Sequence, residues 1–236
     1  MKVLVLSSGR TGASKLLDAL WVRLGQQQLD EYIVIGEPFN SLYKEERNLD
    51  KIKIKGLDYD YDENGSPKWN YPHNLDDFKY EFSDKNVIVK MLVNKYHTPV
   101  EDDIDSAINF FNKTILEFDK LILLTRKNKS KRLKSALHAH QYNKWEKSIP
   151  GKNKKNDIIL KGDDLDDEIN DFLDTEIMIH ELSKKHEVTY MEDIYSSDKE
   201  LAFESWKKIF PGELSFNFNY VYEILKGNLW KNLQVI

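Results

Sequence analysis

Short apolar runs recur along the chain and predict the strands of a parallel sheet. They occupy residues 2–6, 32–35, 87–93, 121–125 and 187–191. Short unbroken apolar runs that end at turn residues are typical of strands buried on both faces. Apolar residues at helical spacing predict helices at 12–24, 101–118 and 163–184. We expect two further helices, at 129–147 and at about 198–209. This alternation predicts an α/β fold: a P-loop-like, three-layer domain whose central, mainly parallel sheet has about five strands, with helices on both faces.

Residues 41–85 depart from this alternation. They are polar, rich in tyrosine and aspartate, and interrupted by glycine and proline. We expect a long loop with one short helix near residues 76–82, because a loop of this length in a compact domain is usually functional or disordered. Residues 148–157 predict a hydrophilic linker. The length of 236 residues suits a single domain, 1–236, that carries the 41–85 loop as an insertion.

Composition narrows the classes of function. The chain has 35 basic and 40 acidic residues, a net charge of −5, which argues against general binding to nucleic acid or anionic membranes. Cysteine is absent, which excludes disulfides, thiolate zinc sites and cysteine nucleophiles. No apolar run approaches a signal-peptide core or a membrane span, so we expect a cytoplasmic protein without an integral membrane segment. The oligomeric state is left open.

The first strand leads into a small-residue loop, Ser7–Ser14, and then into the first predicted helix. Glycines allow backbone N–H groups to close around an anion, and a helix N-terminus adds its positive end. The side chains of Arg10 and Ser14 could add a charge and a hydroxyl. An ordinary strand-to-helix turn is the alternative, but the context favours a phosphate site. Its expected residues are Gly9, Arg10, Thr11, Gly12, Ala13 and Ser14.

A second basic segment, residues 126–135, begins where the fourth predicted strand ends and runs into a helix. It could be a solvated helix face, or a nucleic-acid patch, which the acidic whole argues against. It could also be a second phosphate site, with Arg126 and Ser135 on one phosphate, since arginine at a strand end suits bidentate phosphate recognition. Two phosphate sites on neighbouring strand ends would suit a nucleotide that is phosphorylated at both ends.

The first loop departs from the Walker A pattern of nucleotide triphosphatases. Ser14 stands at the second glycine of that pattern, and Leu16 replaces the hydroxyl residue that binds Mg²⁺. Lys15 remains, and keeps a P-loop kinase or NTPase using ATP as an alternative. The departure disfavours metal-dependent chemistry, and we expect no metal site.

Several short motifs, taken in order, resemble those of the PAPS-dependent sulfotransferases (PAPS is 3′-phosphoadenosine 5′-phosphosulfate), nearest the bacterial nodulation-type branch. The resemblance is spread over about residues 2–210. Gly9 stands where that family has proline, and Ala13 where it has a hydroxyl residue. The motifs are Gly9–Ser14, Glu37 after the second strand, Lys90 within the third, Arg126 with Ser135, Ala139 with Gln141 and Trp145, and Met191-Glu192-Asp193-Ile194.

The resemblance implies transfer of a sulfuryl group from PAPS to a hydroxyl or amine by in-line displacement, with adenosine 3′,5′-bisphosphate as the product. It implies that backbone N–H groups of residues 11–14 hold the 5′-phosphate and that Arg126 and Ser135 hold the 3′-phosphate. Arg10 would neutralise charge on the leaving oxygen, and Lys90 would stabilise the transferring group. Glu37 would accept the proton of the acceptor.

Each of these roles has a competing interpretation. Glu37 could cap a turn, and a carboxylate with an unperturbed pKa of about 4.3 is a weak base unless it is well placed or buried. His97, just after the third strand, is a rival base, since histidine is the commonest general base. A structural salt bridge explains Lys90 about as well as catalysis does.

We expect the acceptor to meet the 41–85 loop. Tyr59, Tyr61, Trp69 and Tyr71 could stack on a sugar or an aromatic ring, or could pin the loop to the domain. The acidic character of the loop argues against a polyanionic acceptor, so a small molecule, a neutral saccharide or a glycolipid fits better. A non-catalytic nucleotide-binding module remains a further alternative.

Overall fold

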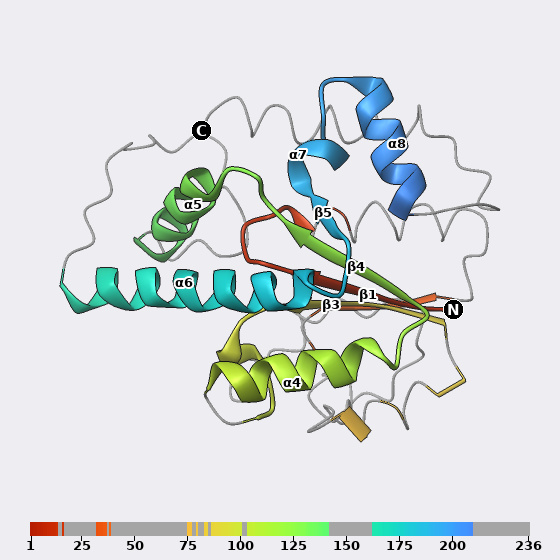
Figure 1. The fold of residues 1–236 in the computed structure, drawn as a ribbon, viewed down its shortest axis with the longest axis horizontal. Coiled ribbons are helices and arrows are strands. Elements are labelled where there is room, and N and C mark those ends of the chain that lie inside the picture. The colour runs from red at the N-terminus through yellow and green to blue at the C-terminus, as the bar shows by residue number, and fades with distance from the viewer. Residues whose placement is uncertain are drawn as a thin grey trace, which may run out of the picture.

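An all-parallel sheet of five strands lies at the centre of the part of the chain that the structure describes (Figure 1). The structure is a computed structural model. It describes residues 1–13, 16, 32–36, 38, 75–76, 79, 83–84, 86–100, 103–141 and 162–209. The strands lie in the order β2-β3-β1-β4-β5. The prediction of an α/β fold with a parallel sheet is confirmed.

The predicted apolar runs form the strands, with ends that differ by one residue or two. The strands are β1 (Lys2–Ser7), β2 (Tyr32–Gly36), β3 (Asn86–Leu92), β4 (Lys120–Thr125) and β5 (Val188–Tyr190). β1 pairs with both β3 and β4, and its residues 3–6 are fully buried. An apolar run without alternation is what a strand covered on both faces requires.

The helices follow the predicted order with one addition. They are α4 (Ile104–Ile115), α5 (Lys129–Gln141), α6 (Asp163–Ser183), α7 (Met191–Ile194) and α8 (Lys199–Ile209), with a 3₁₀ turn η2 (Lys95–His97) after β3. The predicted strand 187–191 ends at Tyr190, because Met191 opens α7, a helix that the sequence pattern did not predict. Helix 101–118 is shorter than predicted, because Asp103 caps its start by accepting the Ser106 N–H at 2.8 Å.

Several predicted elements lie largely outside the described residues. Of the predicted helix 12–24, residues 12, 13 and 16 are described; residues 13 and 16 are helical, whereas Gly12, with a left-handed backbone, is not. Of the 41–85 loop, residues 75, 76 and 79 are described as helical, at the predicted short helix, and residues 83–84 form a turn. The predicted linker 148–157 lies outside the described residues. Among the helices that the structure describes, none is long and apolar enough to cross a membrane.

Two side-chain layers sandwich the sheet. Leu4 and Leu6 of β1 join one buried cluster with Phe111 of α4 and Met178 of α6. Alternate residues of the same strands, such as Val5, are equally buried on the opposite face. Figure 1 shows α7 and α8 on the side of the sheet opposite α4. Burial on both faces leaves the strand ends as the place where polar side chains can gather.

The strand order creates a switch point between β1 and β4. The chain leaves β1 for β2 on one side of the sheet, and it leaves β4 for β5 on the other. In open α/β sheets, the crevice outside the carboxyl ends of two such strands is the usual ligand site. The loop after β1 and the turn after β4 therefore flank the expected position of a ligand.

Candidate functional site

The loop after β1 is built on two residues with left-handed backbone conformation. Arg10 has φ 63° and Gly12 has φ 73°. Arg10 is the one non-glycine residue with positive φ in the described ranges, and this conformation costs an L-residue roughly 1–2 kcal/mol. The Ser8 N–H donates to the Leu124 carbonyl at 3.1 Å, and the Leu16 N–H donates to the Gly12 carbonyl at 3.0 Å. These bonds join the loop to β4 at one end and to the following helix at the other.

The side chain of Arg10 crosses from this loop to helix α5. Its Nε–H donates to the Ser135 Oγ at 3.2 Å, a contact between residues 125 positions apart. Ser135 is buried, whereas the Arg10 side chain keeps an exposed surface. The structure thus brings together two residues that the sequence analysis assigned to two different phosphates.

Arg126, the first residue after β4, is buried beside them. Burial lowers its pKa, and the Glu192 carboxylate, 3.8 Å from its Nε, opposes that shift. Arg10 also has a lowered pKa, first because its guanidinium is packed among protein atoms and second because of the charge of Arg126. Two guanidiniums that repel each other in a partly buried site favour an anion between them.

Three buried polar atoms at this edge lack a hydrogen-bond partner among the residues that the structure describes. They are the Ser7 Oγ, the Thr11 Oγ1 and the Arg126 Nε. Buried polar groups are hydrogen-bonded in the great majority of cases, so such atoms call for a ligand or water. A hydroxyl from the first loop and a guanidinium N–H from the β4 end fit the oxygens of a phosphate.

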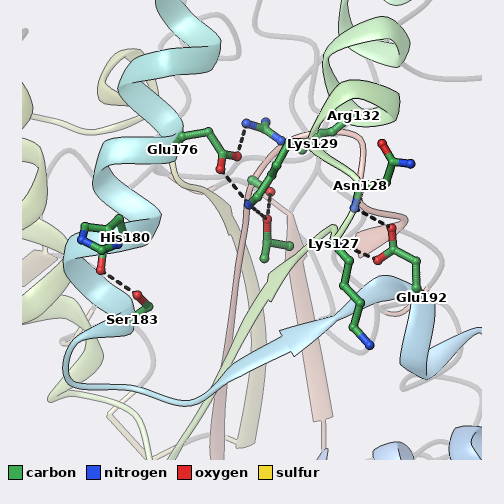
Figure 2. Close-up of polar contacts among 10 residues, drawn as sticks. Lys127, Asn128, Lys129, Arg132, Glu176, His180, Ser183 and Glu192 are labelled. Carbon is green, nitrogen blue, oxygen red and sulfur yellow. Dashed lines mark hydrogen bonds and ion pairs between the residues drawn. The ribbon is translucent and has the colours of Figure 1, made fainter.

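Helix α7 contacts the turn after β4. The Glu192 carboxylate accepts the backbone N–H of Lys127 at 2.9 Å and that of Asn128 at 3.3 Å (Figure 2). The ammonium of Lys127 forms an ion pair with Asp193. Glu192 lies in the predicted Met-Glu-Asp-Ile motif, but its contact with this turn was not predicted, because it depends on β5 pairing with β4.

Tyr195 was missed by the sequence analysis. It follows α7, and its hydroxyl donates to the Gly12 carbonyl at 3.2 Å. A Cβ added at Gly12 would lie 3.2 Å from the Tyr195 Cε2, so the ring packs against the loop. The only sequence signal was the position of Tyr195 beside the Met-Glu-Asp-Ile motif.

Lys90 lies half-buried within β3, in register with Val5 of β1 and Gly36 of β2. By strand alternation it is on the face opposite α4 and α6. Val5 precedes the strand end at Ser7 by two residues, so the Lys90 backbone is about 7 Å short of that edge. Glu37 and Ser14, the other predicted site residues, lie outside the described residues.

His97, the rival base, ends the 3₁₀ turn η2 after β3. The backbone N–H of His97 donates to the Asn94 carbonyl at 3.1 Å. Two contacts join this turn to α6. The Asn94 side-chain amide donates to Asp171, and the Lys95 ammonium forms an ion pair with Asp174 at 3.1 Å. His97 is therefore held at the carboxyl end of β3, one strand away from β1.

A cavity of about 500 Å³ lies on the α6 side of β4, lined by Thr125, Lys127, Lys129, Glu176, Ile179, His180, Ser183, Val188 and Tyr190. Figure 2 shows Glu176 between Arg132 and Lys129, and the Glu176 carboxylate forms an ion pair with each of them. The Arg132 guanidinium also lies over the Phe172 ring, 4.1 Å from its centroid. These contacts join α5 to α6.

Models of known protein families, curated proteins and solved structures gave no match to this chain.

Proposed function

We propose that this protein is a PAPS-dependent sulfotransferase of P-loop-like architecture. The observation that carries the proposal is the convergence of Arg10, Arg126 and Ser135 at the switch point of the sheet. Each of these residues was singled out for phosphate recognition from the sequence, and they come from the ends of two different strands and from one helix.

The charge pattern supports an anionic nucleotide. Arg10 and Arg126 are close enough for the charge of one to lower the pKa of the other. The Thr11 Oγ1 and the Arg126 Nε add buried donors to the same edge. Repulsion between the two guanidiniums would be relieved by a phosphate bound between them, and arginine offers it two parallel N–H groups.

The position of each residue in the site suggests its role in the reaction. PAPS would supply a sulfuryl group on a good leaving phosphate. The backbone of residues 11–14 would hold the 5′-phosphate, and Arg126 and Ser135 would hold the 3′-phosphate. Arg10, in contact with Ser135, would span the two phosphates and neutralise charge on the leaving oxygen. Glu37 would accept the proton of the acceptor hydroxyl, and Lys90 would approach from β3. The acceptor would be a small alcohol, a neutral saccharide or a glycolipid.

A thermal-shift comparison tests the proposal with the purified full chain. A ligand that binds only the folded state raises the melting temperature, by an amount that grows with the logarithm of its concentration relative to its dissociation constant. We expect strong stabilisation by adenosine 3′,5′-bisphosphate without Mg²⁺, and much less by ADP. Stabilisation by ATP–Mg²⁺ but not by the bisphosphate would instead make the protein a P-loop kinase or NTPase.

Turnover separates an enzyme from a binding module. Transfer of ³⁵S from labelled PAPS to a panel of hydroxylated acceptors is the expected activity. Glu37→Gln should abolish this transfer and leave bisphosphate binding intact. Bisphosphate binding by the wild type without transfer to any acceptor class would point to a non-catalytic nucleotide-binding module.

A further inference from the structure

Helix α7 and the residue that follows it contact both loops of the candidate site. Glu192, its second residue, accepts the N–H groups of Lys127 and Asn128 in the turn after β4. Tyr195, the residue after the helix, donates to the Gly12 carbonyl in the loop after β1. The two loops are more than a hundred residues apart in the chain, and α7 bridges them.

The helix itself is firmly held. Met191 and Ile194 are buried, at 5% and 1% exposure. The indole N–H of Trp206 in α8 donates to the Ile194 carbonyl at 3.0 Å, and Trp206 is fully buried. The Tyr195 N–H donates to the Met191 carbonyl at 3.0 Å, which fixes the start of the Tyr195 side chain. A helix anchored in this way can transmit a fixed spacing to both loops.

Glu192 is negatively charged, so its carboxylate would repel a bound anion and does not bind it directly. Its carboxylate lies 3.8 Å from the Arg126 Nε and offsets part of the positive charge there. By electrostatics alone, removing this carboxylate would strengthen the binding of a phosphate. A benefit from Glu192 would therefore have to come from geometry: it holds two backbone N–H groups of the turn and keeps Arg126 at the strand end.

We infer that Glu192 and Tyr195 are positioning residues, which set the spacing between the loop after β1 and the turn after β4. One part of this inference rests on the proposed function: that the spacing between the two loops matches the two phosphates of adenosine 3′,5′-bisphosphate. Neither side chain needs to touch the nucleotide.

Binding of adenosine 3′,5′-bisphosphate to the full chain, measured by calorimetry, separates geometry from charge. Positioning predicts that Glu192→Ala weakens binding about tenfold, although it removes a negative charge, and that Glu192→Gln, which keeps one acceptor oxygen, lies closer to wild type. Tyr195→Phe removes one hydrogen bond and should weaken binding about three- to tenfold. Glu204→Ala on the exposed face of α8 is the matched control and should bind like wild type.

Equal or tighter binding by Glu192→Ala, together with unchanged binding by Tyr195→Phe, would overturn the inference and leave the proposed function standing. Hydrogen exchange without nucleotide gives an independent readout. We expect faster exchange in residues 7–13 of Tyr195→Phe and in residues 126–131 of Glu192→Ala than in the Glu204→Ala control. If the wild type does not bind the bisphosphate, the proposed function fails, and this exchange pattern alone decides the positioning role: unchanged exchange rejects it.

Discussion

The Arg10 Nε lies 3.2 Å from the Ser135 Oγ, which joins the loop after β1 to helix α5 across the switch point of the sheet. Arg10 reaches this position from a left-handed backbone conformation that is unfavourable for arginine. The strain and the contact belong together, because the turn that costs energy is also the turn that directs the side chain toward α5.

The Ser135 hydroxyl should matter for binding more than for stability. Ser135→Ala removes one acceptor of the Arg10 guanidinium, and we expect affinity for adenosine 3′,5′-bisphosphate to fall about tenfold. Ser130→Ala, a change of the same kind on the exposed first turn of α5, is the control and should bind like wild type. Calorimetric titration of both variants checks this, and equal affinities would mean that the Arg10–Ser135 contact has no part in binding.

Arg126 should discriminate between nucleotides with and without a 3′-phosphate. Arg126→Ala should weaken adenosine 3′,5′-bisphosphate by roughly 2–3 kcal/mol and adenosine 5′-phosphate much less, because a charge-assisted bidentate bond would be lost only with the former. Lys134→Ala removes the same charge from the exposed face of α5 and should weaken both ligands slightly. An equal loss for both nucleotides in Arg126→Ala would assign Arg126 to another part of the ligand.

Replacing Gly12 even by alanine should destabilise the fold. Its φ of 73° disfavours alanine by about 1–2 kcal/mol, and the added Cβ would press on the Tyr195 ring at 3.2 Å. We expect Gly12→Ala to lower the free energy of unfolding by about 2 kcal/mol in urea denaturation. Gly9→Ala is the matched control, since a Cβ there would meet no atom within 4 Å, and it should leave stability nearly unchanged.

The buried Arg132 depends on Glu176. Its side chain is 4% exposed, and burial lowers its pKa while Glu176 opposes that shift. Glu176→Met should lower the free energy of unfolding by about 3 kcal/mol, because an arginine that loses its main carboxylate stays buried. The double variant Arg132→Met/Glu176→Met should recover much of this loss in urea denaturation. A double variant no more stable than Glu176→Met would show that packing, not the unpaired charge, sets the cost.

Asp103 should contribute an acid-sensitive part of stability. Hydrogen bonds from Ser106 hold the pKa of this carboxyl below its ordinary value of about 3.9. A depressed folded-state pKa stabilises the fold above the unfolded pKa, and the benefit is lost as pH falls through the folded pKa. Wild type should therefore lose melting temperature below about pH 4 more steeply than Asp103→Asn, which keeps a capping oxygen but does not titrate. Parallel melting curves for the two proteins between pH 6 and pH 3 would contradict this.

The strands and the two candidate loops were predictable because their signals are local. A strand buried on both faces must be apolar throughout, and residues 3–6 and 121–124 satisfy this without reference to any partner. In a parallel sheet, all strands end at the same edge, so Arg10 and Arg126 could be assigned to one edge from their positions after strands.

The contacts of α7 were not predictable in this way. A helix of four residues, Met191–Ile194, has little more than one turn and shows no periodicity. Glu192 reaches the turn after β4 only because β5 pairs with β4, through Leu124 and Thr189 among others. Local sequence patterns do not reveal which distant segments pair in this way.

The sequence by itself therefore determined the type and order of the strands and of the longer helices, and it supplied the residues that we propose bind an anion. The tertiary structure decided the order of the strands, and with it that Arg10 meets Ser135 and that Glu192 and Tyr195 reach both loops. The physical reason is that burial and backbone hydrogen bonding act on each segment separately, whereas the neighbours of a strand depend on how all segments pack around one core.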